Sequence, residues 1–335
     1  MLACSVRCSC RPCRLRSDVP SHHAPSATTC SGIARPAQPT DLAPSHKPGP
    51  YTAGVTTANR DIGVCSWSLC PSGPDDLVGK VRACGLSVVQ LALDPIREAR
   101  WDESRTRQLL WDAGIAVASG MMAMAGEDYS SLESIRETGG VRSDRHWRAN
   151  LDAARRNADL THRLGITLVT FHAGFLPHDE SDPLRALMLE RLGAIADVFG
   201  AAGVRVGFET GQETAGTLLD VLDDLDRANV GVNFDPANMI LYGMGDPVEA
   251  LRELADHVMQ LHIKDAVPSR QPGSWGTETP AGRGAVNWDR CFALIREMPP
   301  AVGLMIEREG GQNRIEDIRA ARDLVRRCLG DDSPS

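Results

Sequence analysis

The feature that most constrains the fold of this chain is a regular alternation of short apolar runs and amphipathic stretches from Ile62 onward. Short apolar runs are typical of buried strands, and the stretches between them have helical periodicity. A glycine stands just before several of these runs, where it would end a helix in the left-handed conformation. The predicted strands are 62–66, 87–93, 115–121, 166–172, 204–209, 230–235, 258–263 and 302–307.

Eight strands, each followed by a helix, over about 270 residues predict a closed (β/α)8 barrel, an α/β fold. The predicted helices are 74–84, 103–113, 145–164, 183–202, 214–228, 246–256, 289–297 and 314–329. An open doubly wound sheet is the alternative, but no G-x-G-x-x-G motif follows the first strand to bind a dinucleotide. We therefore expect a TIM barrel over residues 61–330.

Residues 1–60 differ in composition from the rest of the chain. They hold five of the ten cysteines and eight of the 21 prolines, and they show no hydrophobic period. Such a segment cannot bury enough apolar surface to offset its chain entropy, so we predict a disordered N-terminal extension. A metal or disulfide knot of Cys4, Cys8, Cys10 and Cys13 is an alternative, although their spacing matches no standard zinc motif. An organellar transit peptide, or a start assigned too far upstream, would also explain the basic, acid-poor composition.

The charge balance excludes some classes of function. The net charge is −8, and residues 1–60 carry seven basic and two acidic side chains, so the remainder of the chain stands at −13. Because an acidic body repels a phosphate backbone, we expect no nucleic-acid partner. No run of 18 apolar residues occurs, so we expect no membrane span. The five cysteines beyond residue 60 show no pairing pattern, which favours a reducing, cytoplasmic location.

Three carboxylates and a histidine stand at the ends of four consecutive predicted strands, where the chemistry of a (β/α)8 barrel lies. Buried carboxylates need a counter-charge, and no Lys or Arg lies inside these strands, although Lys264 and Arg308 stand close by. One divalent cation would supply it, with Mn²⁺ the first choice and Mg²⁺, Co²⁺ or Zn²⁺ as alternatives. The competing interpretation is four isolated rim residues, each paired locally. The predicted ligands are Glu209, Asp235, His262 and Glu307.

Six further side chains are predicted to contact the substrate, because each follows a strand end or stands in a glycine-rich loop. The charged ones could bind hydroxyl or anionic oxygens, the histidine could also act as an acid, and the tryptophans could form apolar walls against a sugar ring. Packing, helix capping or exposure to solvent is the competing interpretation for each. The six are His172, Lys264, Glu127, Trp67, Trp275 and Arg283.

Several short strings resemble those of the sugar phosphate isomerase/epimerase family, within the xylose isomerase-like barrel superfamily. The resemblance covers roughly residues 61–329 and implies the same four metal ligands. It also implies that Glu209 and Glu307 flank the substrate and exchange protons at carbon. One departure is that no histidine follows Asp235 before His257, which argues against a three-metal nuclease cluster and weakens equivalence to the keto-sugar 3-epimerases. The strings are Phe171-His-Ala-Gly174, Gly207-Phe-Glu-Thr-Gly211, Asn233-Phe-Asp-Pro-Ala-Asn238, Leu261-His-Ile-Lys-Asp265, Gly282-Arg-Gly284 with Trp288, and Ile306-Glu-Arg-Glu309.

The predicted function is that of a metal-dependent sugar isomerase or epimerase, which moves a proton next to a carbonyl through a metal-stabilised enediolate. The expected substrate is a small sugar or polyol ketone. Loss of a β-hydroxyl from the same intermediate would make the protein a dehydratase of a keto-sugar or inosose instead. A phosphodiester endonuclease would need a basic rim and extra histidines, and a non-catalytic sugar-binding barrel would be expected to lose a ligand. By analogy with related barrels, a homo-oligomer is also expected.

Overall fold

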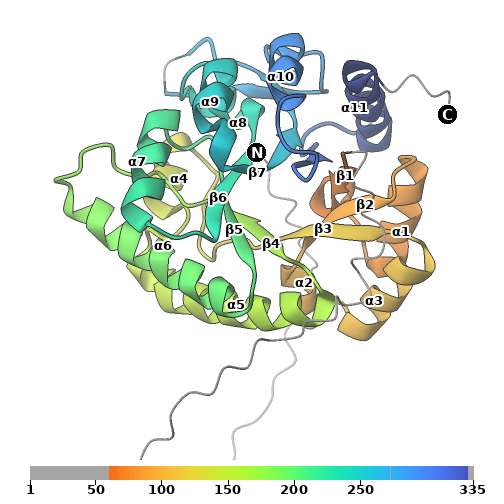
Figure 1. Ribbon diagram of the computed structural model, residues 1–335, viewed down its shortest axis with the longest axis horizontal. Helices are drawn as coiled ribbons and strands as arrows, with labels where there is room; N and C mark the ends of the chain where they lie inside the picture. Colours follow the sequence, from red (N-terminus) through yellow and green to blue (C-terminus); the bar gives the residue numbers. More distant parts are fainter. Residues whose placement is uncertain (1–59, 272, 331–335) are drawn as a thin grey trace, which may run out of the picture. The chain divides into compact units, whose positions relative to one another are not determined.

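Eight parallel strands of the computed structural model close into a barrel, which confirms the predicted fold (Figure 1). The structure describes residues 60–271 and 273–330, so the predicted extension lies outside the described residues except for Arg60. Around the barrel the order is β1, β10, β7, β6, β5, β4, β3, β2 and back to β1. The strands are β1 (Ile62–Cys65), β2 (Val88–Ala92), β3 (Ala116–Met121), β4 (Leu168–Phe171), β5 (Arg205–Glu209), β6 (Val230–Phe234), β7 (Val258–Ile263) and β10 (Gly303–Ile306).

Eight main helices alternate with these strands in the described part of the chain and surround the barrel (Figure 1). Their first turns are fixed locally: Asp102, Asp182, Thr214 and Asp246 each accept a hydrogen bond from a backbone N–H of the helix that follows. The helices begin and end within a few residues of the predicted bounds. They are α1 (Pro74–Ala83), α3 (Glu103–Asp112), α5 (Asp144–Leu164), α6 (Pro183–Ala201), α7 (Ala215–Leu225), α9 (Pro247–Leu254), α10 (Trp288–Ile295) and α11 (Arg314–Leu329).

Several short elements were not predicted, and most of them follow the C-terminal end of a strand. They are too short to show a hydrophobic period, so the sequence alone could not reveal them. β8 and β9 form an antiparallel pair separate from the barrel. These elements are η2 (Ser66–Leu69), α2 (Asp94–Arg97), α4 (Leu132–Thr138), α8 (Pro236–Tyr242), η3 (Ala255–His257), β8 (Asp265–Val267) and β9 (Thr277–Thr279).

A layer of polar side chains lies inside the barrel, and we call it the polar layer. The hydroxyl of Ser119 on β3 donates to Oε1 of Gln260 on β7 at 2.6 Å, and Nε2 of Gln90 on β2 donates to the hydroxyl of Thr170 on β4 at 2.7 Å. Neither pair joins neighbouring strands, so both hydrogen bonds cross the barrel interior. Bulky branched apolar residues usually fill that space. The polar layer, completed by Asn233 on β6, departs from that usual apolar filling.

Arg60, at the start of the described residues, binds a segment that lies more than 230 positions later in the sequence. Its guanidinium donates to the backbone carbonyls of Ile295, Met298, Pro299 and Val302, around the C-terminal end of α10. A cation at this position satisfies carbonyls that a helix end leaves without partners. Arg60 thus ties the chain just before β1 to the loop before β10.

Two further expectations from the sequence were that the cysteines beyond residue 60 are unpaired and that no segment spans a membrane. All five cysteines of the described residues, which include Cys65, are free. None of the helices in the described part of the chain is long and apolar enough to cross a lipid bilayer.

Candidate metal centre and substrate cavity

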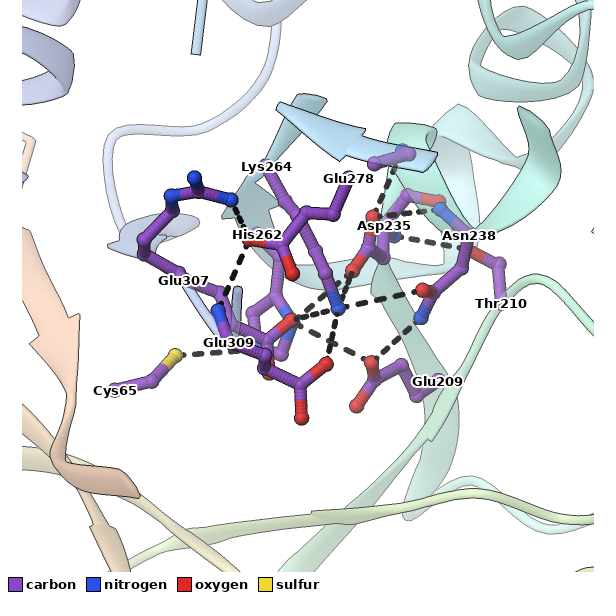
Figure 2. Close-up of polar contacts among 12 residues, drawn as sticks. Cys65, Glu209, Thr210, Asp235, Asn238, His262, Lys264, Glu278, Glu307 and Glu309 are labelled. Atoms are coloured by element: carbon purple, nitrogen blue, oxygen red, sulfur yellow. Dashed lines mark hydrogen bonds and ion pairs between the residues drawn. The ribbon is translucent and has the colours of Figure 1, made fainter. Parts of the chain in front are cut away.

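The four predicted ligands lie together at the C-terminal end of the barrel (Figure 2). Glu209 is the last residue of β5, His262 lies near the end of β7, and Asp235 and Glu307 directly follow β6 and β10. One ligand atom from each lies within 4.8 Å of the other three. All four side chains are buried. The barrel thus brings together at one point residues that lie up to 98 positions apart in the sequence.

The donor atoms of this cluster converge around Nδ1 of His262. That nitrogen lies 3.2 Å from Oε2 of Glu307, 3.5 Å from Oε1 of Glu209 and 3.6 Å from Oδ2 of Asp235. Nδ1 of His262 and Oδ2 of Asp235 are buried and have no hydrogen-bond partner among the described residues. Buried polar atoms without partners are costly, and a cation between them would satisfy both. Three carboxylates and one imidazole are a donor set that suits a divalent cation.

Local contacts orient two of the carboxylates. Asp235 caps α8: its Oδ1 accepts the backbone N–H groups of Ala237 at 2.8 Å and Asn238 at 3.0 Å, which leaves Oδ2 free to face the cluster. Pro236 suits the first turn of this helix because a helix leaves that backbone position without a hydrogen-bond acceptor. The side-chain amide of Asn238 then donates to Oε1 of Glu209 at 2.9 Å. The short helix α8 therefore holds both Asp235 and Glu209 in place.

Lys264, directly after β7, supplies a cation beside the cluster (Figure 2). Its Nζ lies 2.8 Å from Oε2 of Glu307, 2.8 Å from Oε2 of Glu309 and 3.7 Å from Oδ2 of Asp235. Burial would lower the pKa of Lys264, but these carboxylates raise it well above its ordinary value. Lys264 was predicted to bind substrate oxygens, whereas here it pairs with protein carboxylates. With Glu209 included, four carboxyl groups lie close to one ammonium and one imidazole, so a dication would offset more of their negative charge.

The charge state of the two glutamates follows from the same contacts. Burial opposes ionisation of Glu307, but the Lys264 ammonium and His262 hold the pKa of its carboxyl well below the usual range. Burial also opposes ionisation of Glu209, and the imidazoles of His172 and His262 lower its pKa below the ordinary value. Both glutamates are therefore carboxylates at neutral pH, the form that can bind a cation or accept a proton.

A cavity of about 310 Å³ adjoins the cluster, and Glu307 and Glu309 line part of it. Three of the predicted substrate-binding residues, Trp67, Glu127 and His172, also line it. The Nε1–H of Trp67 donates to Oε1 of Glu307 at 2.6 Å, which fixes one carboxylate oxygen of that ligand. The other lining residues are mostly apolar, although Asp94 and Arg100 are among them, so the cavity combines charged and apolar surfaces, as small-molecule sites commonly do.

Glu127 and His172 have distinct surroundings at this cavity. The carboxylate of Glu127 accepts hydrogen bonds from the backbone N–H of Gly140 at 3.0 Å and the hydroxyl of Tyr129 at 3.3 Å. Burial raises the pKa of Glu127 above its ordinary value. His172 places Nε2 3.6 Å from Oε1 of Glu209, and its buried Nδ1 has no hydrogen-bond partner within the described residues. His172 is therefore available to exchange a proton or hydrogen bond with a molecule in the cavity.

Three predicted substrate residues do not line this cavity: Lys264, which pairs with the carboxylates described above, Arg283 and Trp275. Arg283 is exposed, and Trp275 packs on Tyr242, with ring centroids 4.9 Å apart. The glycines beside Arg283 have a structural explanation: a Cβ on Gly284 would lie 2.1 Å from Oδ1 of Asp265. Glycine at 284 therefore lets the backbone approach a buried carboxylate rather than a ligand.

Sequence reasoning did not assign Glu309 and Asn238 to the site. Glu309 belongs to the string Ile306-Glu-Arg-Glu309, and in an extended segment it would face the same side as Glu307, two residues before it. That spacing was the available signal. Asn238 has no comparable signal, because its contact with Glu209 depends on the unpredicted helix α8.

Comparisons with known proteins agree with this architecture. Residues 78–328 match the family described as "Xylose isomerase-like TIM barrel". The uncharacterized protein YihM of Escherichia coli (strain K12) is 25% identical over 143 residues, a match that spans 40% of this chain and only 44% of YihM. A xylose isomerase domain protein from Planctomyces limnophilus is 28% identical, with a TM-score of 0.71 over 81% of this chain and 97% of that one.

Two solved structures with lower identity share the fold. L-ribulose 3-epimerase is 18% identical, with a TM-score of 0.63 over 81% of this chain and 95% of that chain. The probable 3-DHS dehydratase AsbF of Bacillus anthracis is 17% identical, with a TM-score of 0.62 over 79% of this chain and 98% of its own. The family match covers most of the barrel, including all four residues of the candidate metal centre. This chain therefore belongs to the xylose isomerase-like TIM barrel family.

Proposed function

We propose that this protein is a divalent-metal-dependent isomerase or epimerase that transfers a proton at the carbon next to the carbonyl of a small sugar or polyol ketone. The catalytic unit is the barrel over residues 61–330. The observation that carries the proposal is a pair of buried atoms, Nδ1 of His262 and Oδ2 of Asp235. They have no hydrogen-bond partner among the described residues, and they face two ionised glutamates beside a cavity.

The cation would be held by Glu209, Asp235, His262 and Glu307. When bound, it would polarise a substrate carbonyl and lower the pKa of the adjacent C–H. Mn²⁺ is our first choice among the cations that suit this donor set, and Mg²⁺, Co²⁺ and Zn²⁺ are the alternatives.

Proton transfer falls to the two glutamates. Glu209 accepts the proton from carbon, and the imidazole of His172, 3.6 Å from its Oε1, supports the charge of the carboxylate. Glu307 lines the cavity, and its carboxylate is fixed by Trp67 and Lys264. Return of a proton to the opposite face would give an epimer, and return to the neighbouring carbon would give an aldose–ketose isomer.

Dehydration is the second candidate, and the position of His172 favours it. The ring lines the cavity, and its Nδ1 has no hydrogen-bond partner in the part of the chain that the structure describes, so its protonated form could donate to a departing β-hydroxyl. The similarity in fold to the dehydratase AsbF is in keeping with this alternative. The two reactions share the first proton abstraction and differ in the step after it.

A metal-binding measurement and an isotope-exchange measurement together test the proposal. The full chain is stripped with a chelator, and its binding of Mn²⁺ is measured by calorimetry. The loaded protein is then incubated in D₂O with a panel of ketoses and inososes. We expect one divalent ion per chain and deuterium at the carbon next to the carbonyl. Loss of water with formation of an unsaturated product would instead identify the dehydratase.

The matched control is Asp235→Asn, which keeps the size of the side chain but removes the charge of one proposed ligand. This variant should bind Mn²⁺ more weakly than the wild type, and its rate of deuterium exchange into the substrate should fall in proportion to the loss of bound Mn²⁺. A protein that binds no divalent ion, or one that binds the ion yet exchanges no carbon-bound proton in any substrate, would contradict the proposed function.

A further inference from the structure

The polar layer reaches the metal centre through the second nitrogen of His262. Nε2 of this ring lies 2.8 Å from Oε1 of Gln90, which stands on β2, a strand that is not a neighbour of β7. The same nitrogen lies 3.0 Å from Nδ2 of Asn233 on β6. The side chains of Gln90, Asn233 and His262 are fully buried. Water therefore cannot take the place of either amide beside the ring.

The thiol sulfur of Cys65 also lies 3.7 Å from Nε2. The two amide neighbours of Nε2, which are closer, favour opposite positions of the ring proton. The amide oxygen of Gln90 is an acceptor and requires a proton on Nε2, whereas the amide nitrogen of Asn233 is a donor and requires a lone pair there. A neutral imidazole carries its proton on one nitrogen only. Nδ1 has a lone pair for a cation only when the proton is on Nε2, and Nδ1 is the nitrogen that faces Glu307, Glu209 and Asp235.

The Gln90 amide has two further side-chain contacts besides His262. Its Nε2 donates to the hydroxyl of Thr170 at 2.7 Å, and its Oε1 also accepts from the thiol of Cys65 at 3.3 Å. Both partners are buried. Both contacts fit an amide whose oxygen, rather than its nitrogen, faces His262.

We propose that Gln90 is a positioning residue: it keeps the ring proton of His262 on Nε2 and so directs the lone pair of Nδ1 to the metal centre. This inference rests on the proposed function only in requiring a divalent cation. Partners that orient a ligating histidine in this way commonly change metal affinity by about 10–100-fold when they are removed. Gln90 itself contacts none of the three carboxylate ligands in any hydrogen bond of the described residues.

The test compares three forms of the full chain: wild type, Gln90→Met and Gln90→Glu. Methionine has a similar length but no strong acceptor, whereas glutamate restores an acceptor oxygen. We expect Gln90→Met to raise the Kd for Mn²⁺ about 10–100-fold in calorimetry, and Gln90→Glu to bind distinctly more tightly than Gln90→Met. In ¹⁵N-histidine-labelled protein loaded with diamagnetic Zn²⁺, NMR should find the His262 proton on Nε2 in the wild type.

Gln260→Met is the matched control, because Gln260 is a second buried glutamine of the polar layer that bonds to Ser119 and Asn233 but not to the ring. We expect its Kd for Mn²⁺ to stay within about threefold of wild type. Equal weakening by both methionine variants would overturn the inference, because it would reflect packing of the layer. Wild-type affinity for Mn²⁺ in Gln90→Met would also overturn the inference, and so would a His262 proton on Nδ1 in the Zn²⁺-loaded protein. The proposed function would survive each of these results. A wild type without any divalent-ion binding would overturn both.

Discussion

Replacement of Asp265 by asparagine should destabilise the barrel, although Asp265 binds neither the proposed metal nor the substrate. Its carboxylate is buried at the start of β8 and accepts five hydrogen bonds. Oδ1 accepts from the backbone N–H groups of Ala266 at 2.9 Å and Val286 at 3.1 Å, and Oδ2 accepts from Gly282 N at 2.9 Å, Gly284 N at 3.1 Å and Trp288 Nε1 at 3.0 Å. Whichever way the new amide turns, its NH₂ group faces at least two N–H donors.

The expected cost follows from that count. A hydrogen bond to a charged group contributes roughly 1.5–3 kcal/mol, so loss of two or more lowers the free energy of unfolding by about 3–6 kcal/mol. With an m-value of about 3 kcal/mol/M, the midpoint of urea unfolding should fall by about 1–2 M. The control is Asp246→Asn, because Asp246 caps α9 and asparagine caps a helix equally well. A shift for Asp265→Asn no larger than that of Asp246→Asn would refute the reasoning.

Three other predictions concern the site and its surroundings. Glu209→Gln, which keeps the shape of the side chain but cannot accept a proton, should lower substrate deuterium exchange by about 10²–10⁴-fold with the circular dichroism spectrum unchanged; wild-type exchange would exclude Glu209 as the base. Addition of Mn²⁺ at 100 times its Kd should stabilise the chelated protein by about 2.7 kcal/mol and raise Tm by roughly 5–10 °C, a shift that Asp235→Asn should largely lose. Burial raises the pKa of Glu213 to about 8, so the folded protein holds a proton that the unfolded chain releases from about pH 4.5 upward. The stability that this proton provides is present below that pH and lost as the pH rises to about 8. The free energy of unfolding of Glu213→Gln, measured in urea, should therefore rise relative to that of the wild type by roughly 3–5 kcal/mol between about pH 4.5 and pH 8. A difference between the two proteins that does not change with pH would contradict this prediction.

The sequence was sufficient to predict the barrel because the signals for its strands and helices are local and recur along the chain. Each of the eight strands is a short apolar run, and the helices between them have clear start signals. Asp182, which caps the N-terminus of α6, is one such signal. Repetition of this pattern eight times leaves few alternatives to a closed parallel sheet. The short helices α4 and α8 and the pair β8 and β9 are too short for any period, and tertiary contacts decide whether they form.

Part of the candidate site could be read from the sequence for a related reason. In a barrel, strand ends meet at one rim, so the positions of Glu209, Asp235, His262 and Glu307 along the chain were enough to predict that they converge. The role of Lys264 was not predictable, because its pairing with Glu307 and Glu309 depends on where three side chains end in space. For the same reason Arg283 and Trp275 were assigned to a cavity that they do not line.

By itself, the sequence determined the eight-fold strand and helix order and the residue types at the strand ends, because hydrophobic periodicity and helix capping act over a few neighbouring residues. Only the tertiary structure decided which atoms of those residues face one another. Within the described part of the chain, it left Nδ1 of His262 and Oδ2 of Asp235 without a hydrogen-bond partner and set Gln90 behind the ring. Such contacts join residues that are far apart in the sequence, 172 positions for Gln90 and His262, and their geometry is set by the closure of the barrel rather than by any local pattern.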